Sequence, residues 1–293
     1  MRVALSFSML LVLCSLAVPA MAAADPFRVW DGYKKAFVSF DTMLDSLAQE
    51  QVVVMGEIHD SPATHRCELA VFEGLLARRA RTTLAMEMFE RDVQDVVDRY
   101  LAGKIDAETF ARDARAWGNH ETDYRPMVDR AKAGGTPVVA SNVPRSLAGA
   151  VARGGIAALD DMPASHRWMY ARHTTAPSDT YREHFLETMK SHGGTQATEA
   201  MDRFYAAQCL KDDTMAESVA DWLERKGSAV DVVLHVNGAF HSDDNLGLVT
   251  KLRERLPKAR IATVRIVPVD NLEAPEVAKW QATADWIVFV PAP

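Results

Sequence analysis

The chain has 293 residues, with 33 Lys or Arg against 40 Asp or Glu, and its formal net charge is −7. This length is enough for one large domain or two small ones. The acidic balance argues against nucleic acid as a partner, because nucleic-acid binding calls for clustered basic residues.

The first 24 residues have the order of a secretory signal peptide. Arg2 supplies a positive charge, an apolar run covers residues 3–18, and small residues follow. Cleavage is expected after Ala22 or Ala24, so the mature protein is exported from the cytoplasm. Cys14 raises lipoprotein processing as an alternative, but the leucine before it is too large for the usual lipoprotein site.

Six short apolar runs predict buried strands. They are residues 52–55, 82–86, 137–140, 230–236, 261–267 and 286–290. Continuous apolar runs are typical of strands that are buried on both faces. Helical patterns between them favour a mostly parallel sheet. We therefore expect residues 25–293 to form a single α/β domain with a mixed, mostly parallel central sheet flanked by helices.

The first predicted strand ends in Gly56-Glu57-Ile58-His59, and a helix follows. Ser61 can cap this helix, Pro62 suits its first turn, and His65 lies on its buried face. In open α/β sheets, ligands bind beyond the carboxyl ends of the strands. Because charged side chains are costly to bury unless they are paired, Glu57 and His59 are candidates for a site at this point.

The fourth predicted strand ends in Gly238-Ala239-Phe240-His241, a second Gly-x-x-His pattern. The second predicted strand ends in Glu87, the first charged residue after an apolar run. If these ends converge, His59, His241, Glu57 and Glu87 form a donor set for a divalent metal, with one carboxylate left as a base. The alternatives are histidines that lie in loops or cap helices, and a Glu87 that sits at a helix start.

The third predicted strand ends in Asn142, and Arg145 follows closely enough to hold a carboxylate or a propionate in a two-pronged contact. From residue 143 to 227 we find no strand pattern, so this stretch is expected to be an inserted helical subdomain. Within it, Gln208 and Asp212 interrupt an apolar stripe. Buried polar groups need partners, so these two are expected to orient the histidines or to fasten a neighbouring element.

The same stretch gathers histidines, tyrosines and methionines. One helix carries Tyr181, Met189 and His192 on a single face, with Thr180 and Glu183 as its capping box. Flexible thioethers suit an adaptable apolar pocket, although an ordinary aromatic core is the alternative. A tyrosine phenolate is one of the known types of haem ligand.

Two cysteines, Cys67 and Cys209, remain after cleavage of the signal. Both lie on predicted helices that pack near the same sheet. In an oxidising compartment such a pair often forms a disulfide. The alternative is two buried thiols, which spacing alone does not distinguish.

At Gly56-Glu57-Ile58-His59-Asp60-Ser61-Pro62 the chain resembles the ChaN-like haem-binding proteins. These are part of a superfamily with the Tiki metalloproteases, TraB-like proteins and erythromycin esterases. Further similar segments cover almost the full mature length, and in order they are Met86-Glu87-Met88, Tyr124-Arg125-Pro126, Asn142-Val143-Pro144-Arg145, Ala207-Gln208, Asp212-Asp213-Thr214-Met215-Ala216 and Gly238-Ala239-Phe240-His241.

The second motif departs from the family pattern. Relatives tend to have Gly-Asn-x-His followed by a basic or apolar stretch, whereas here Gly-Ala-Phe-His precedes Ser242-Asp243-Asp244-Asn245. Lys211 also stands where an aromatic residue is common.

The resemblance implies an α/β core with extra helices, in a bacterial envelope protein of haem-iron uptake. In such proteins two haems can lie face to face between two subunits. A tyrosine of one subunit ligates the iron, and a histidine of the other contacts the propionates. On the helical pattern, Tyr181 and Tyr170 are the candidate ligands, and Arg145, Met189 and His192 the candidate lining.

Our leading hypothesis is therefore a haem-binding protein for haem-iron uptake or storage, in the periplasm or at the outer membrane of a Gram-negative bacterium. It would be a homodimer when loaded with haem and would work with an outer-membrane haem receptor. We expect one polar pocket at the strand ends, with haem beside it under the helical insertion. The alternative is a metal-dependent hydrolase that uses the two histidines with Glu57 and Glu87.

Overall fold

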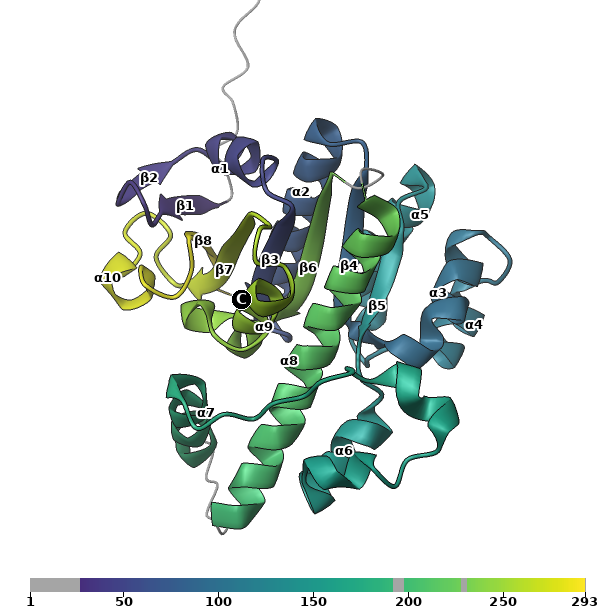
Figure 1. The fold of residues 1–293 in the computed structure, drawn as a ribbon. Coiled ribbons are helices and arrows are strands. Elements are labelled where there is room, and N and C mark those ends of the chain that lie inside the picture. Colours follow the sequence, from purple (N-terminus) through teal and green to yellow (C-terminus); the bar gives the residue numbers. More distant parts are fainter. Residues whose placement is uncertain (1–26, 192–197, 228–230, 293) are drawn as a thin grey trace, which may run out of the picture.

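The computed structural model describes residues 27–191, 198–227 and 231–292 (Figure 1). Its described strands form one sheet in the order β2-β1-β8-β7-β3-β6-β4-β5. The strands are β1 (Arg28–Asp31), β2 (Ala36–Val38), β3 (Val52–Glu57), β4 (Thr82–Glu90), β5 (Val138–Asn142), β6 (Val232–Gly238), β7 (Ile261–Val269) and β8 (Trp286–Pro291). β3 to β8 run parallel, and β1 is antiparallel to β2 and β8. The mixed, mostly parallel α/β sheet is confirmed.

The helices cover both faces of this sheet. They are α1 (Phe40–Leu47), α2 (Pro62–Arg78), α3 (Gln94–Leu101), α4 (Ala107–Asp113), α5 (Arg125–Gly134), α6 (Arg145–Gly154), α7 (Thr180–Ser191), α8 (Thr198–Lys226), α9 (Leu248–Arg255) and α10 (Val277–Trp280). Shorter helical turns are η1 (Arg91–Val93), η2 (His120–Tyr124), η3 (Ile156–Leu159), η4 (Ala164–Met169), η6 (Ala239–His241) and η7 (Asp243–Asn245). None of the helices in the described part of the chain has the length and apolar character needed to cross a bilayer.

β3 shows why the apolar runs are continuous. Its side chains alternate between the two faces, as the two-residue period of a strand requires. Val53 and Met55 belong to the core that α1, α2, α3 and α5 cover, whereas Val52 and Val54 belong to the core under α8 and α9. The strand is buried on both faces, so every one of these positions is apolar.

The described residues between β5 and β6 form helices and no strand. The second half of α8 packs on the sheet through Met215 and Val219. Its first half continues past the carboxyl ends of the strands, where it meets α6 and α7; Figure 1 shows these three helices below the sheet. This arrangement encloses the space just beyond the strand ends.

Two sequence-based expectations about helix caps are wrong in detail. Ser61 does precede α2, but its hydroxyl makes no capping hydrogen bond. The cap of α7 is Asp179, whose carboxylate accepts a hydrogen bond from the backbone N–H of Arg182 at 3.1 Å. Thr180 is therefore the first helical residue rather than the cap, because the short aspartate side chain already satisfies the third amide.

Of the two alternatives for the cysteines, the structure has the buried thiols and not the disulfide. Cys67 and Cys209 are both free and buried. Cys67 of α2 belongs to the core between α2 and the sheet, whereas Cys209 of α8 packs with α7 beyond the strand ends. The two helices cover opposite faces of the sheet (Figure 1), so packing near the same sheet does not bring the sulfurs together.

Candidate functional site

A cavity of about 980 Å³ lies beyond the carboxyl ends of β3, β4, β5 and β6 and is closed by α6, α7 and α8. Four of its lining residues are the expected Glu57, His59, Glu87 and His241. They meet because β3 and β6 are parallel neighbours, with Glu57 opposite Gly238 in the register. The structure therefore brings the two Gly-x-x-His segments to one place.

The two glycines let the segments pack against each other. A Cβ atom on Gly56 would lie 2.8 Å from Oγ of Ser242 and 3.0 Å from Cα of Ala239, just after β6. A Cβ atom on Gly238 would lie 2.5 Å from Nε2 of His59. Each glycine thus makes room for the segment that follows the other strand, which is the close approach that only glycine allows.

His59 is held by its neighbour and stays accessible from the cavity. Its Nδ1 lies 2.6 Å from Oε1 of Glu57, and the Tyr124 hydroxyl donates to the same oxygen at 2.8 Å. The ring packs edge-on against Trp117, and 44% of the side chain is exposed. Burial lowers the pKa of His59, but the hydrogen bond with Glu57 and the charges of Glu87 and Glu57 together raise it above its usual value. Nε2 has no hydrogen-bond partner within the described chain.

His241 is buried among carboxylates. Its Nδ1 lies 2.6 Å from Oδ1 of Asp212 and 3.0 Å from Nε2 of Gln208, and its Nε2 lies 3.3 Å from Oε1 of Glu87. Burial lowers the pKa of His241, but the charges of Glu87 and Asp212 raise it to about 10. The side chain is therefore an imidazolium at neutral pH, held between the carboxylates of Glu87 on β4 and Asp212 on α8.

Glu87 stands inside β4, which continues to Glu90, rather than at a strand end. The pairing of β4 with β5 shifts register between Met86 and Glu90, and this irregularity turns Glu87 toward β6. Its Oε2 accepts the backbone N–H of Gly238 at 2.8 Å, and Asn142 donates to its carbonyl oxygen at 3.1 Å. Burial raises the pKa of Glu87, but the charge of His241 lowers it below the usual range.

The residues expected to bind haem divide into two groups. Arg145 of α6 and Met189 of α7 line the cavity. Tyr181 and Tyr170 do not: the Tyr181 hydroxyl donates to Asp212 at 2.8 Å, and Tyr170 packs between α6 and α8. Burial, followed by the charge of Asp212, raises the pKa of Tyr181 well above its usual value. His192 lies outside the described residues.

Sequence reasoning missed part of the lining. Lys211 of α8 faces the cavity three residues after Gln208, so the helical spacing from that glutamine would have found it. Trp117 and Phe240 form aromatic walls from segments without a periodic pattern, which gave no such signal. Arg145 and Lys211 have no carboxylate partner in the described part of the structure.

A sequence model of one family, described as haem-binding uptake, Tiki superfamily, ChaN, matches residues 43–252. The chain belongs to this family. No curated protein matches it in sequence.

Solved structures extend the comparison to most of the chain. The ChaN of Campylobacter jejuni, described as binding haem cofacially, has a TM-score of 0.69 at 17% identity, over 89% of this chain and 96% of that one. An erythromycin esterase, EreC, in its open conformation has a TM-score of 0.51 at 12% identity, over 91% and 97% of the two chains. At these identities the likeness shows a shared ChaN-like fold.

The metal set expected from the sequence, His59, His241, Glu57 and Glu87, stays a prediction. In the described part of the chain, the His/Cys/Asp/Glu group whose ligand atoms lie within 4.8 Å of one another is Glu57, His65 and Glu68. Glu57 is the one member shared with the expected set. The imidazoles of His59 and His241 are instead engaged by carboxylates through Nδ1. His65 of α2 faces Glu57 at the end of β3 and does not line the cavity.

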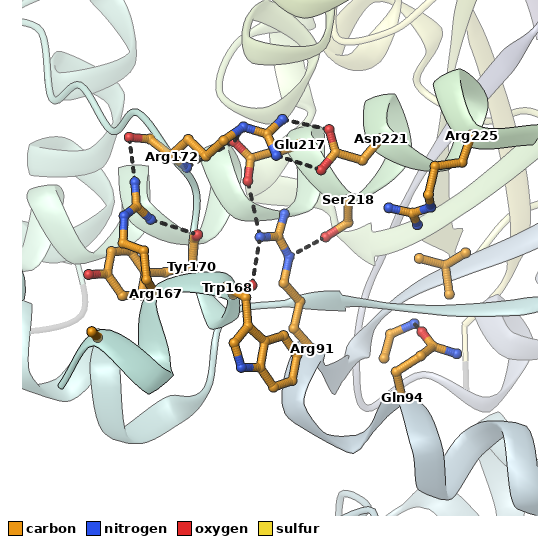
Figure 2. A pocket seen from close by; sticks show the side chains of 13 residues that line it. Arg91, Gln94, Arg167, Trp168, Tyr170, Arg172, Glu217, Ser218, Asp221 and Arg225 are labelled. Carbon is orange, nitrogen blue, oxygen red and sulfur yellow. Dashed lines mark hydrogen bonds and ion pairs between the residues drawn. The ribbon is translucent and has the colours of Figure 1, made fainter. Parts of the chain in front are cut away.

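A second cavity, of about 750 Å³, lies between η1, η4 and the second half of α8. Figure 2 shows Arg91 and Arg172 turned toward the acids of α8. Arg91 contacts Oε1 of Glu217 at 3.1 Å and the Ser218 hydroxyl at 2.8 Å. Arg172 holds Asp221 with both terminal nitrogens, at 2.8 and 2.6 Å.

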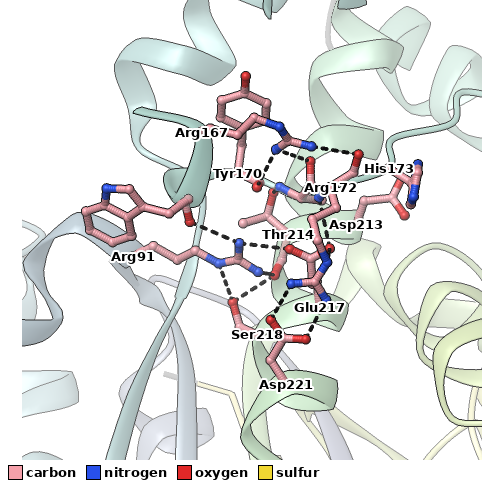
Figure 3. A network of polar contacts seen from close by, with 12 residues as sticks. Arg91, Arg167, Tyr170, Arg172, His173, Asp213, Thr214, Glu217, Ser218 and Asp221 are labelled. Atoms are coloured by element: carbon pink, nitrogen blue, oxygen red, sulfur yellow. Dashed lines mark hydrogen bonds and ion pairs between the residues drawn. The ribbon is translucent and has the colours of Figure 1, made fainter. Parts of the chain in front are cut away.

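These contacts form one continuous network that fastens α8 to η1 and to the segment after η4 (Figure 3). Arg91 also donates to the carbonyl of Thr214 at 2.8 Å, and Arg167 donates to the carbonyls of Ala171 and Arg172 at 3.1 and 2.7 Å. Because the charged groups that meet there are satisfied within the chain, we assign this network to structure. The candidate site of this ChaN family member is the strand-end cavity.

Proposed function

We propose that this protein binds haem in the strand-end cavity, as part of haem-iron uptake or storage. Its family supports the class of ligand. The observation that carries the assignment to this cavity is its lining. Aromatic and apolar walls meet two unpaired cations and one imidazole nitrogen that has no partner, and these are the groups that a flat, dianionic, iron-containing ligand requires.

The size and chemistry of the cavity fit this ligand. Its volume of about 980 Å³ is at the upper end of the range for sites of drug-sized ligands, which is about 300–1,000 Å³. Trp117, Phe185 and Phe240 supply flat apolar surface. Arg145 and Lys211 are placed to bind carboxylates, Arg145 with a planar fork that matches them.

Haem bound there would supply an iron centre and two propionates. Among the described residues that line the cavity there is no tyrosine. The side chain we propose as the iron ligand is therefore His59, through Nε2. Glu57 fixes its ring and tautomer by holding Nδ1, which is how metal-bound histidines are usually oriented.

Titration of the mature protein with haemin tests this proposal. We expect a shifted Soret band that saturates at stoichiometric haem. R145A and K211A should each weaken binding about five- to tenfold, because each removes one carboxylate contact worth roughly 1 kcal/mol. R225A, an exposed arginine of the second cavity, is the matched control and should bind like the wild type. No Soret shift at stoichiometric haem would refute the function, and equal losses in all three variants would refute the site.

We also propose that haem-loaded protein is a homodimer, that it is exported, and that it exchanges haem with an outer-membrane receptor. The signal-like first 24 residues motivate export; they lie outside the described residues. Light scattering with and without haemin tests the dimer. Cell fractionation followed by N-terminal sequencing tests export and the cleavage site, and an intact N-terminus on cytoplasmic protein would contradict it.

A second candidate function is hydrolysis, because two histidines held by carboxylates face one cavity. His59 with Glu57 has the geometry of a general base whose free nitrogen points to a ligand space. Hydrolysis of p-nitrophenyl acetate by the haem-free protein, with H59A as the comparison, tests it. Hydrolysis that is unchanged in H59A would refute this second function. If the protein binds haemin but hydrolyses nothing, haem binding is the function that stands.

A further inference from the structure

A buried polar cluster lies on the other side of Glu57 from the cavity, and haem binding does not account for it. His65 and Glu68, both on α2, face the end of β3. Nδ1 of His65 lies 3.0 Å from Oε2 of Glu57 and 3.1 Å from Oε2 of Glu68. All three side chains are at most 3% exposed. Two carboxylates thus share one imidazole nitrogen in the core.

The cluster is under-satisfied. Oε1 of Glu68 is buried and has no hydrogen-bond partner, and Oε2 of Glu57 has only the ion pair with His65. The hydroxyls of Ser61 and Thr64 are also buried without a hydrogen-bond partner. Ser61, Thr64 and Glu68 are spaced by three and four residues, so they lie on one side of the helix. Burial, followed by the charge of Glu57, raises the pKa of Glu68 well above its usual value. Such groups are costly to bury unless something binds them.

The groups around the cluster hold it in one orientation. Nε2 of His65 lies 3.2 Å from the carbonyl oxygen of His59, so this nitrogen carries a proton and fixes the ring. Nδ1 faces the two carboxylates and would give up its own proton when a metal binds. The Tyr124 hydroxyl donates to Oε1 of Glu57 at 2.8 Å, so Oε2 is directed toward His65. Metal-binding histidines and carboxylates are characteristically fixed in this way by a second set of hydrogen bonds.

We propose that Glu57, His65 and Glu68 bind one divalent transition-metal cation. Their ligand atoms lie within 4.8 Å of one another, close enough to share an ion. One imidazole with two carboxylates suits Mn²⁺ or Zn²⁺. The cation would link α2 to the end of β3. It would also fix Glu57, whose other oxygen holds His59 in the cavity, so the metal site supports the ligand site without forming part of it.

Elemental analysis and thermal unfolding test this site on the full mature protein. Purified without chelator, or dialysed against EDTA and then given Mn²⁺ or Zn²⁺, the wild type should hold about one equivalent of metal and gain several degrees in Tm. E68Q keeps the shape of the side chain and should lose both effects. H65N should behave like E68Q. H241N and E87Q alter the other histidine–carboxylate group and should keep both effects.

Two results would overturn the proposal. One is a wild-type protein with less than about 0.1 equivalent of metal and a Tm that neither cation changes. The other is metal binding that survives in E68Q. If the cluster holds a proton instead of a metal, E68Q should leave the Tm of the metal-free protein unchanged or raise it, because it removes a buried carboxylate. Haemin binding by the wild type is measured in a separate titration, so the metal-site proposal and the haem-binding proposal can each be refuted without the other.

Discussion

Replacing Gly238 by alanine should displace His59 without straining the backbone. Gly238 has φ −56° and ψ 135°, which any residue adopts. The new methyl group, however, would lie 2.5 Å from Nε2 and 2.8 Å from Cε1 of His59, closer than real Cβ atoms come to other atoms. The ring is at the end of a half-exposed side chain, so it moves while β6 stays in place.

The cost follows from the contact that the ring gives up. A hydrogen bond to a charged group contributes about 1.5–3 kcal/mol, and the bond between His59 and Glu57 is of this kind. Because 44% of the His59 side chain is exposed, solvent reduces this value, and we expect G238A to lower the free energy of unfolding by about 1–2 kcal/mol.

Urea unfolding of a double-mutant cycle measures this effect. G238A is compared in the wild-type and H59A backgrounds, because in H59A the alanine methyl no longer meets the imidazole. The predicted cost should fall to within about 0.5 kcal/mol of zero in H59A. An equal cost of G238A in both backgrounds would refute the reasoning, since it would place the strain in β6 itself.

Three further predictions follow from contacts in the site and the core. G56A should lower the free energy of unfolding by about 2–3 kcal/mol, more than G238A does, because its methyl group would contact the backbone of Ala239, which cannot rotate away as a side chain can. Urea unfolding measures this loss, and a smaller one would contradict the close packing of the two glycine segments. The pKa of His241 is raised to about 10 in the folded protein, so its contribution to the free energy of unfolding is full below pH 6.5 and is lost as the pH rises toward 10. Between pH 7 and 9 the free energy of unfolding should therefore fall less steeply in H241N than in the wild type, by up to about 1.4 kcal/mol per pH unit. An unchanged slope would contradict the charge assigned to His241. Burial raises the pKa of Cys67 and of Cys209, so a thiol reagent should modify neither sulfur in the native mature protein. In denaturant without reductant it should modify both. If it modifies neither after unfolding, the two sulfurs form a disulfide.

The sequence predicted the part of the molecule that depends on local pattern. Continuous apolar runs identified the parallel strands, and the two glycines marked the strand ends that meet. β1 and β2 were missed because they are short, and β2 is mostly exposed, so neither has a continuous apolar run. Glu87 was placed at a strand end because a charged residue usually ends a buried run; the register shift in β4 lets the strand continue to Glu90.

The sequence could not show which hydrogen-bond partner each site residue has, because these partners come from helices and strands that are far apart in the chain. Gln208 and Asp212 were expected to orient the histidines or to fasten a neighbouring element, and both contact His241. The pattern did not indicate that Asp212 would also take up the Tyr181 hydroxyl. Nor did it show that His65 would contact the far oxygen of Glu57, because a helical stripe gives a buried face but not the atom that faces it.

The visible and resonance Raman spectra of haemin-loaded H59A test the central claim most directly, with Y181F as the comparison. Our account predicts that the wild type and Y181F share a spectrum of imidazole ligation, and that H59A loses it together with at least tenfold of its haem affinity, while Glu57 remains in place. A tyrosinate charge-transfer band in the wild type that persists in H59A and disappears in Y181F would contradict it.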